Sequence, residues 1–163
     1  MRKPSAIAGS AVFFLAAPCV IAGLLPWLIT RWQGLTPSLP LIVLGAVLII
    51  AGIAVLLHAF TRFALEGSGT PAPVAPTETL VVGGIYRHVR NPMYVAVIGI
   101  ILAQLLLFAS PALALYAALV AAAMVGFVLV YEEPTLARRY GNAYETYRRN
   151  VPGWLPRITP WRG

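Results

Sequence analysis

The segment NPMYVAVIGIILAQLLLFASPALALYAALVAAAMVGFVLVY, residues 91–131, contains no charged side chain. A helix needs about 20 apolar residues to span a membrane, so this segment is long enough for two spans. FASPA at 108–112 divides it, because Ser-Pro is a turn signal. The segment therefore predicts a tight hairpin of two membrane helices, at about 93–108 and 112–131, of which the first is unusually short.

Two earlier charge-free stretches predict two more spans. One precedes Arg31 and the other runs from Arg31 to Arg62; they predict helices at about 6–29 and 39–61. The start of the first resembles a signal peptide, but its uncharged run is longer than a typical signal core, so we expect the helix to be retained. We therefore predict an all-α integral membrane protein with four transmembrane helices, folded as one membrane domain over residues 1–163.

The composition supports this membrane class. The chain of 163 residues is 60% hydrophobic and only 10% charged, whereas a soluble domain carries about 25% charged residues. The net charge of +7 would also suit a nucleic-acid partner. The cations lie beside apolar runs, however, where they suit anionic lipid headgroups, so we expect membrane lipids and no nucleic acid as partners. The single cysteine excludes an internal disulfide and a cysteine-built metal site, and we expect no metal.

The cations also predict an orientation. Four spans place the amino terminus, the loop at 62–92 and the tail on one side of the membrane. Of the 12 arginines and lysines, all except Arg31 fall on that side. Cytoplasmic loops carry such an excess of cations. We therefore expect both termini to lie in the cytoplasm, in a bacterial inner membrane.

Polar residues converge on the cytoplasmic side of this topology. YRHVRNPMY at 86–94 leads into the third helix there, and YEEPTLARRY at 131–140 leads out of the fourth. A tight hairpin sets these two helix ends about one helix spacing apart, roughly 8–10 Å. The two motifs are therefore predicted to face each other in a region formed by residues 62–94 and 131–157.

The second motif sets an acid pair opposite a cation cluster. Glu132 and Glu133 would close the fourth helix, where the helix dipole disfavours acids. Their compensation comes either from Arg87 and Arg90 or from a bound cationic group. Each cluster by itself would be a headgroup anchor or a solvated helix end. Together they indicate a functional site, because polar groups near membrane depth are costly.

Two flanking segments complete the predicted site. In the preceding loop, Gly67, Ser68 and Gly69 would let the backbone approach a ligand closely, with a flexible linker as the alternative interpretation. After Pro134 the chain predicts a C-terminal interfacial amphipathic helix, in one piece or broken at Gly141. Its apolar face is formed by Leu136, Tyr140, Tyr144 and Tyr147.

The same residues resemble the integral-membrane methyltransferases, a group that includes isoprenylcysteine carboxyl methyltransferases and phospholipid N-methyltransferases. The resemblance covers roughly residues 62–157. The matching elements are Arg90-Asn91-Pro92-Met93-Tyr94, Glu132-Glu133, Gly141, Tyr144 and Tyr147, and Val151-Pro152. The phospholipid enzymes share Asn-Pro-Met-Tyr, Tyr-Glu-Glu-Pro and an upstream Gly-x-Gly. The isoprenylcysteine enzymes usually have histidine at the position of Asn91.

The resemblance implies that S-adenosylmethionine binds at the cytoplasmic face and that a lipid-like or prenylated acceptor arrives from the bilayer. A glutamate would remove a proton from an amine acceptor, and an arginine would orient a carboxylate acceptor. The catalytic candidates are Glu133, Arg138 and Arg139. The cofactor-binding candidates are Gly67, Ser68, Gly69, Tyr86, Arg87, His88, Arg90, Asn91, Tyr94, Glu132 and Glu133.

We therefore expect S-adenosylmethionine-dependent methyl transfer of the isoprenylcysteine carboxyl methyltransferase type, with phospholipid N-methylation as the alternative. A small four-helix transporter or a non-catalytic membrane scaffold is the alternative from a different class. A transporter would usually need an ionisable group within a span, and a scaffold would have no use for the acid pair. The oligomeric state is left open.

Overall fold

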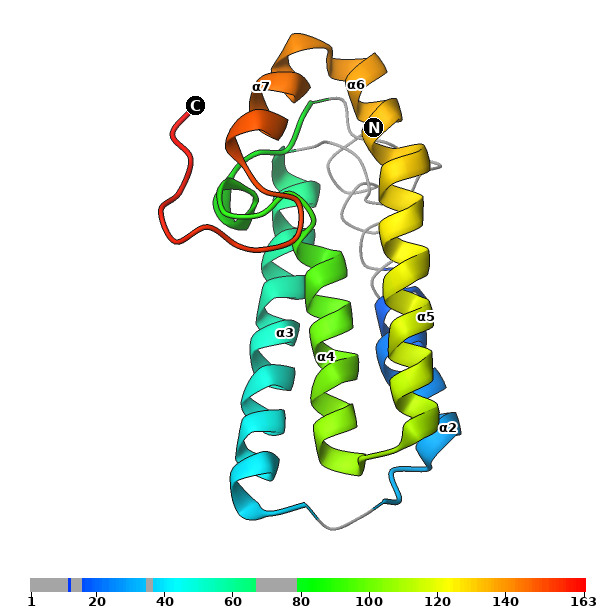
Figure 1. Cartoon of the computed structure of the whole chain (residues 1–163). Coiled ribbons are helices and arrows are strands. Elements are labelled where there is room, and N and C mark those ends of the chain that lie inside the picture. Colours follow the sequence, from blue (N-terminus) through cyan, green and yellow to red (C-terminus); the bar gives the residue numbers. More distant parts are fainter. Residues whose placement is uncertain (1–11, 13–15, 35–36, 67–78) are drawn as a thin grey trace.

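The computed structural model describes residue 12 and residues 16–34, 37–66 and 79–163. Within these ranges every regular element is helical, as the sequence predicted (Figure 1). Here η1 and η3 are π-helical turns and η2 is a 3-10 turn. The elements are η1 (Val20–Leu24), α2 (Leu25–Thr30), α3 (Leu39–Glu66), η2 (Gly84–Arg87), α4 (Pro92–Phe108), α5 (Pro111–Phe127), η3 (Val128–Glu132), α6 (Glu133–Tyr140) and α7 (Asn142–Asn150).

The predicted hairpin is formed by α4 and α5. Ala109 ends α4 in the left-handed conformation, with a φ of 46°. Ser110 caps α5, because its side chain accepts a hydrogen bond from the Leu113 N–H, and Pro111 occupies the first turn, where a missing N–H has no cost. The Ser-Pro signal therefore marks the turn correctly.

Among the described residues, two helices are long and apolar enough to cross a membrane. They are Leu39–Phe63, with a mean hydropathy of 2.9, and the continuous helix Pro111–Tyr140, with a mean hydropathy of 2.5. Only 17% of each apolar window is buried inside the protein, whereas the core helix of a soluble protein is mostly buried. The exposed apolar surface therefore indicates lipid contact. Val20–Thr30 and α4 are shorter apolar helices, so the arrangement of four full spans stays a prediction.

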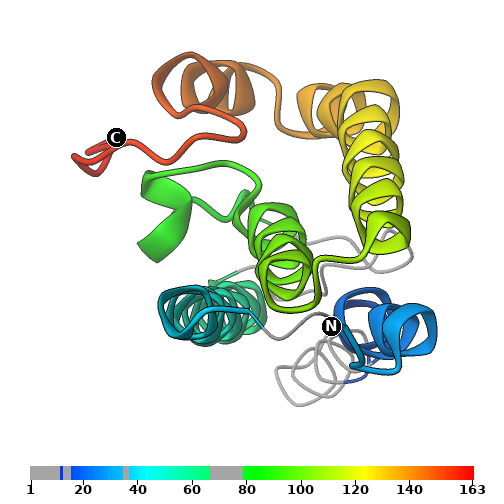
Figure 2. The same cartoon turned by 60° about the horizontal axis from the view of Figure 1, so that its bottom comes forward.

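Helix α4 lies at the centre of the bundle, between α3 and α5 (Figure 2). Two glycines of α3 allow the closest approach. A Cβ on Gly52 would lie 2.6 Å from Ile100 Cγ1, and a Cβ on Gly45 would lie 2.7 Å from Leu107 Cδ2. Small residues at a helix crossing favour such packing within membranes. These contacts hold α3 against the middle and the end of α4.

The fourth predicted helix does not end at Tyr131. Instead, α5 passes through the π-helical turn η3 into α6, so that the helix continues to Tyr140. Pro134, beyond the predicted end of this helix, lies in the first turn of α6, and the widened turn before it accommodates its missing N–H. The acid pair therefore lies within a continuous helix and not at a helix C-terminus.

The C-terminal helix is broken at Gly141, which has a φ of 52°. The break separates α6 from α7, as one of the two sequence alternatives proposed. The apolar face of α7 does not lie free at an interface, however. Tyr144 and Tyr147 are buried in a cluster with Val81, Tyr86 and Val151. Helix α7 therefore packs on the protein with the face that was expected to anchor it to lipid.

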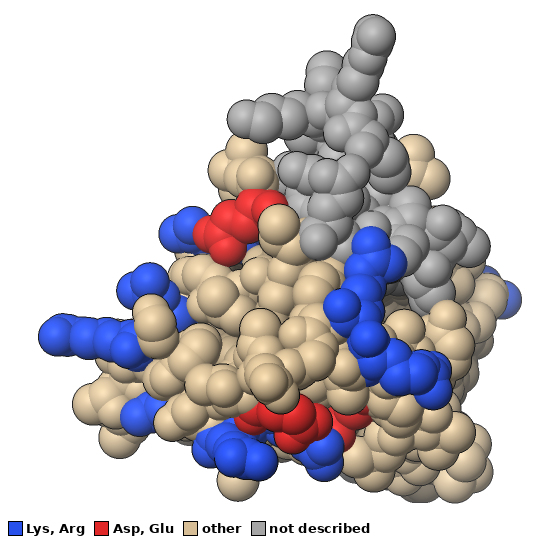
Figure 3. All heavy atoms as spheres, turned by 90° about the horizontal axis from the view of Figure 1, so that it is seen from above, with Lys and Arg blue, Asp and Glu red and all other residues tan. Residues whose placement is uncertain are grey.

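The ends of α3 and α6, the segment 79–91, α7 and the tail meet at one end of the bundle (Figure 1). Seen from that end, basic side chains lie beside each patch of acids (Figure 3). Arg31 lies after α2 at the opposite end, where Gly34 packs on the backbone of Phe108. The unequal charge at the two ends matches the pattern that predicted the orientation, and which end faces the cytoplasm stays a prediction.

Candidate active site

A cavity of about 510 Å³ lies beneath α6 and α7, at the end of the bundle that carries most arginines. Small-molecule sites commonly measure about 300–1,000 Å³. Its floor is apolar and includes Phe60, Val97, Met124 and Phe127. The predicted site residues that line it are Tyr86, Arg90, Asn91, Tyr94, Glu132, Glu133 and Arg139.

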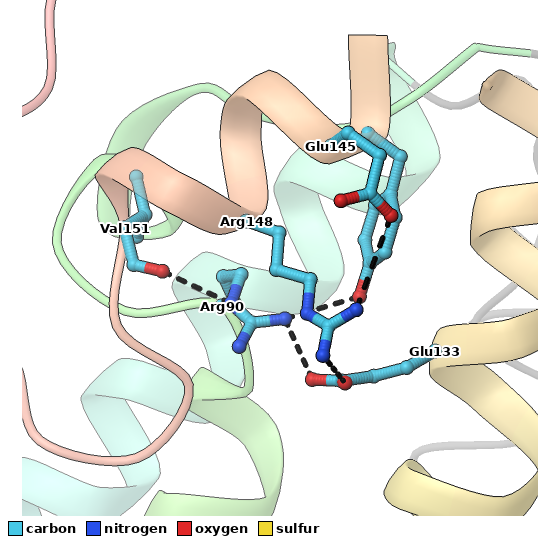
Figure 4. Close-up of polar contacts among 6 residues, drawn as sticks. Arg90, Glu133, Glu145, Arg148 and Val151 are labelled. Carbon is cyan, nitrogen blue, oxygen red and sulfur yellow. Dashed lines mark hydrogen bonds and ion pairs between the residues drawn. The ribbon is translucent and has the colours of Figure 1, made fainter. Parts of the chain in front are cut away.

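Arg90 ties three segments together above this cavity (Figure 4). Its Nη1 donates to Glu133 Oε1 at 2.7 Å and to the Tyr144 hydroxyl at 3.0 Å. Its Nε donates to the Val151 carbonyl at 2.9 Å. A planar guanidinium can satisfy such a set of acceptors, whereas an ammonium cannot match its geometry. Arg90 therefore joins the start of α4 to α6, α7 and the tail.

Glu133 is neutralised by arginines within the protein. Its Oε1 accepts the Arg90 hydrogen bond, and its Oε2 lies 3.5 Å from Arg148 Nη2 (Figure 4). The side chains of Arg90 and Glu133 are only 13% and 10% exposed, so solvent screens this pair weakly. Arginines therefore compensate the charge of Glu133, which was the first of the two predicted alternatives. Arg148 takes part, although it was not predicted to do so.

Glu132, its neighbour, has different surroundings. Its Oε2 accepts a hydrogen bond from the Tyr94 hydroxyl at 2.9 Å. Within the described part of the chain, no arginine or lysine lies at ion-pair distance from it. Trp154 of the tail supports Tyr94, with ring centroids 6.4 Å apart. Glu132 is therefore a carboxylate on the cavity wall whose charge the described residues leave without a cation.

The tail holds the YRHVRNPMY loop in place. The backbone N–H groups of Arg90 and Asn91 donate to the carbonyls of Pro152 and Gly153, at 2.9 and 3.2 Å. His88 Nδ1 lies 2.8 Å from the Arg157 carbonyl oxygen, and the Arg157 N–H donates to the His88 carbonyl at 2.9 Å. His88 thus contacts the tail and does not line the cavity. The Val151-Pro152 element of the family motif therefore forms part of the contact between the tail and this loop.

Two polar groups at the cavity have no hydrogen-bond partner. The Asn91 side-chain nitrogen and the Tyr86 hydroxyl are both buried and unpaired among the described residues. Buried polar groups are nearly always hydrogen-bonded, so such exceptions indicate a missing ligand or water. Tyr147 secures the backbone here, because its hydroxyl donates to the Tyr86 carbonyl at 2.7 Å. Burial raises the pKa of the Tyr147 phenol, which keeps this donor neutral.

The structure thus brings together part of the predicted set. Arg87 and Arg138 are exposed, and neither they nor His88 lines the cavity. Gly67, Ser68 and Gly69 lie outside the described residues. Tyr144 and Tyr147 line the cavity, although they were predicted as part of an apolar helix face and of the family motif and not as site residues. Their spacing on one helical face and their place in the family motif were the available signals, and such a face is equally typical of a surface helix.

Comparison with known proteins adds the family. No curated protein and no solved structure matches the chain. The sequence model of the family described as phospholipid methyltransferase matches residues 40–143, which is more than half of the chain. The match extends from α3 through the hairpin and α6, and includes both Asn-Pro-Met-Tyr and Tyr-Glu-Glu-Pro. The integral-membrane methyltransferase resemblance is thereby confirmed, and the chain belongs to the phospholipid methyltransferase family.

Proposed function

We propose that this membrane methyltransferase transfers a methyl group from S-adenosylmethionine to the amine of a phospholipid. The observation that carries the proposal is the cavity beside Glu132, which combines an apolar floor with a carboxylate that no described arginine or lysine neutralises. The family description supports a phospholipid as the acceptor. The sequence motifs alone placed phospholipid N-methylation second.

The residues present fit the cofactor. S-adenosylmethionine would supply an electrophilic methyl group, and it offers a carboxylate, ribose hydroxyls and adenine nitrogens as acceptors. The unpaired donors of Asn91 and Tyr86 suit such acceptors. Arg139 lines the cavity without a carboxylate partner among the described residues and suits the carboxylate. Arg90 is less suited to that role, because Glu133 already binds it.

Glu132 is the residue that we assign to the acceptor. An amine attacks only after it has lost a proton, and a carboxylate at hydrogen-bonding distance can accept that proton. The Tyr94 hydroxyl fixes the orientation of Glu132 by donating to Oε2 and leaves Oε1 for the acceptor. The chain otherwise contributes positioning and exclusion of water, which are the main requirements for methyl transfer. We assign Glu133 to positioning, because Arg90 and Arg148 occupy its two oxygens.

Methyl esterification of a prenylated cysteine is the second candidate. Arg139 at the cavity favours it, since an arginine can orient a carboxylate acceptor. The Tyr144 and Val151-Pro152 elements shared with the isoprenylcysteine enzymes do not decide the question. Their observed contacts are with Arg90, so they support the site in either case.

Binding of the demethylated cofactor product, measured by calorimetry on the protein in detergent, tests the cofactor. We expect saturable binding that Asn91→Leu weakens about tenfold or more, because the variant removes a buried donor. Asn142→Leu, at an exposed position of α7, is the matched control and should bind like the wild type. Absence of saturable binding would support a transporter or a scaffold instead.

Transfer of a labelled methyl group separates the two acceptors. The assay offers phosphatidylethanolamine and a prenylcysteine analogue side by side. Base-stable label in the lipid amine is the expected result. Base-labile label in the prenylcysteine analogue would establish an ester and replace the first candidate by the second.

A further inference from the structure

A second cavity, of about 290 Å³, lies in the half of the bundle toward Arg31. Residues of η1, α3 and α4 line it, and nearly all of them are apolar. Gln104 is the polar exception, and its side-chain nitrogen already donates to the Ala22 carbonyl at 2.6 Å. The chemistry of this lower cavity therefore suits a hydrocarbon and offers no charged group to a polar ligand.

On α3, the upper and lower cavities share one face. Ile49, Ile53 and Leu56 line the lower cavity, and Phe60 and Phe63 line the upper one. These residues follow one another at intervals of three or four, which places them on the same side of a helix. The two linings thus meet within one helical turn, between Leu56 and Phe60.

Helix α4 repeats this arrangement. Val97 lines the upper cavity, and Ile100, Gln104 and Leu107 continue the same face in the lower one. Pro18, before η1, lines both cavities. Three independent segments therefore run from one cavity into the next. The two linings therefore lie end to end along the bundle, and together they are called the groove.

The length of this groove matches a lipid chain. Tyr94 marks the level of the proposed reaction, and Gln104 lies ten residues further along α4. At 1.5 Å per residue the separation is about 15 Å. One leaflet contributes half of a hydrocarbon core that is about 30 Å thick, which is also about 15 Å. A chain whose headgroup lies beside Tyr94 thus ends inside the lower cavity.

We propose that the lower cavity binds the end of one hydrocarbon tail of the methyl acceptor and so selects acceptors by tail length. The proposal rests on the proposed function, because it places the acceptor headgroup at Glu132. The acceptor's own tail is favoured over a second copy of the chain because the lower cavity continues the cavity of the reaction and lies between three segments of one chain.

Gly23 allows the lower cavity to be filled without disturbing the fold. It lines this cavity, and a Cβ built on it has no atom within 4 Å. Gly23→Leu therefore places a side chain in the space assigned to the tail. Gly126→Leu is the matched control, because Gly126 has equally open space but lines neither cavity. Both variants replace a glycine by a leucine within an apolar helix.

The test compares dihexanoyl- and dipalmitoyl-phosphatidylethanolamine as acceptors in mixed micelles. We expect the wild type to have the higher kcat/KM with the long-chain lipid. Gly23→Leu should lower that value about tenfold, roughly the effect of losing two buried methylenes, and leave the short-chain lipid unaffected. Gly126→Leu should match the wild type with both. Equal chain-length preference in all three proteins, or equal losses with both lipids in Gly23→Leu, would overturn the proposal.

Cys19 provides a readout that does not depend on activity. It is the single cysteine of the chain, is exposed and lines the lower cavity. Dipalmitoyl-phosphatidylethanolamine should slow its alkylation by a maleimide several-fold in the wild type, and Gly23→Leu should abolish the slowing by lipid. Protection without methyl transfer would retain the tail site and reject the proposed reaction. Alkylation that slows with protein concentration and not with lipid would assign the surface to a second copy.

Discussion

At the scale of single residues, two adjacent glutamates have opposite surroundings. Glu133 is buried between Arg90 and Arg148, while Glu132 accepts only the Tyr94 hydroxyl among the described residues. Adjacent positions on a helix point about 100° apart, so two acids that both line the cavity can have different neighbours. Consequently, we expect mutations of these neighbours to separate function from stability.

Glu132→Gln should abolish most activity and leave the fold intact. Glutamine can still accept the Tyr94 hydrogen bond but cannot take a proton from the acceptor, and loss of a general base commonly lowers the rate by about 10²–10⁴. Single-turnover methyl transfer measures the loss, and binding of the demethylated cofactor product shows whether the site survives. Activity within a few-fold of the wild type would remove Glu132 from the catalytic role.

Glu133→Ala should instead destabilise the protein. It leaves the buried Arg90 charge without its carboxylate partner, which costs about 3–5 kcal/mol for a pair of this kind. Unfolding of the protein in mixed micelles measures the change. Glu145→Ala is the control, because its contact with Arg148 is 3.9 Å long and its side chain is 41% exposed, so its loss should cost less than about 1 kcal/mol. Similar losses in both variants would contradict the assignment.

At the scale of elements, the continuation of α5 into α6 and the break before α7 build the roof of the cavity. The π-helical turn η3 carries the helix past Pro134, and Gly141 then reverses its direction toward the tail. Gly141 has a φ of 52° and a ψ of −129°, a conformation that residues with a Cβ rarely adopt. The break therefore depends on glycine at this position.

Gly141→Ala isolates that backbone effect. A Cβ at this position has no atom within 4 Å, so steric contact with neighbours contributes nothing. We expect a loss of about 1–3 kcal/mol in the free energy of unfolding, from backbone strain alone. Gly126→Ala, at the end of α5 but inside the continuous helix Pro111–Tyr140, should have no effect or stabilise the helix slightly. A neutral result for Gly141→Ala would show that α6 and α7 can join in another way.

At the scale of the whole molecule, the distribution of charge and the position of the cavity indicate the same orientation in the membrane. The end that carries the cavity also carries most of the described arginines, and the opposite end carries Arg31. An excess of cations marks the cytoplasmic side of membrane proteins. A cofactor made in the cytoplasm would then reach the cavity directly, and an acceptor would enter from the bilayer along the groove.

Cysteine labelling in sealed vesicles checks this orientation. With Cys19 replaced by serine, Thr159→Cys reports on the tail and Gln33→Cys on the opposite end. A membrane-impermeant maleimide added outside inside-out vesicles should label only Thr159→Cys, and in right-side-out vesicles only Gln33→Cys. The reverse pattern would invert the predicted topology. Labelling of both variants from one side would contradict the odd number of spans that the predicted topology places between them.

Much of the architecture could be read from the sequence. The charge-free segment 91–131 and its Ser-Pro turn predicted the hairpin. The charge-free stretch between Arg31 and Arg62 predicted α3, because a helix that spans a membrane needs about 20 residues without charge. The convergence of both polar motifs at one end followed from the hairpin alone. The family resemblance rested on the same two motifs and is confirmed.

The tertiary structure decided what each polar residue does. Arg90 and Glu133 are held by Tyr144, Val151 and Arg148, residues far away in the chain whose side-chain directions no local pattern specifies. The tyrosine face of α7 packs on protein and not on lipid. Both environments remove the tyrosines from water, so the sequence pattern could not distinguish between them. The sequence by itself thus determined where the long apolar helices lie and at which end of them the polar motifs meet. Only packing decided which charges neutralise one another, and so which carboxylate is left for a substrate.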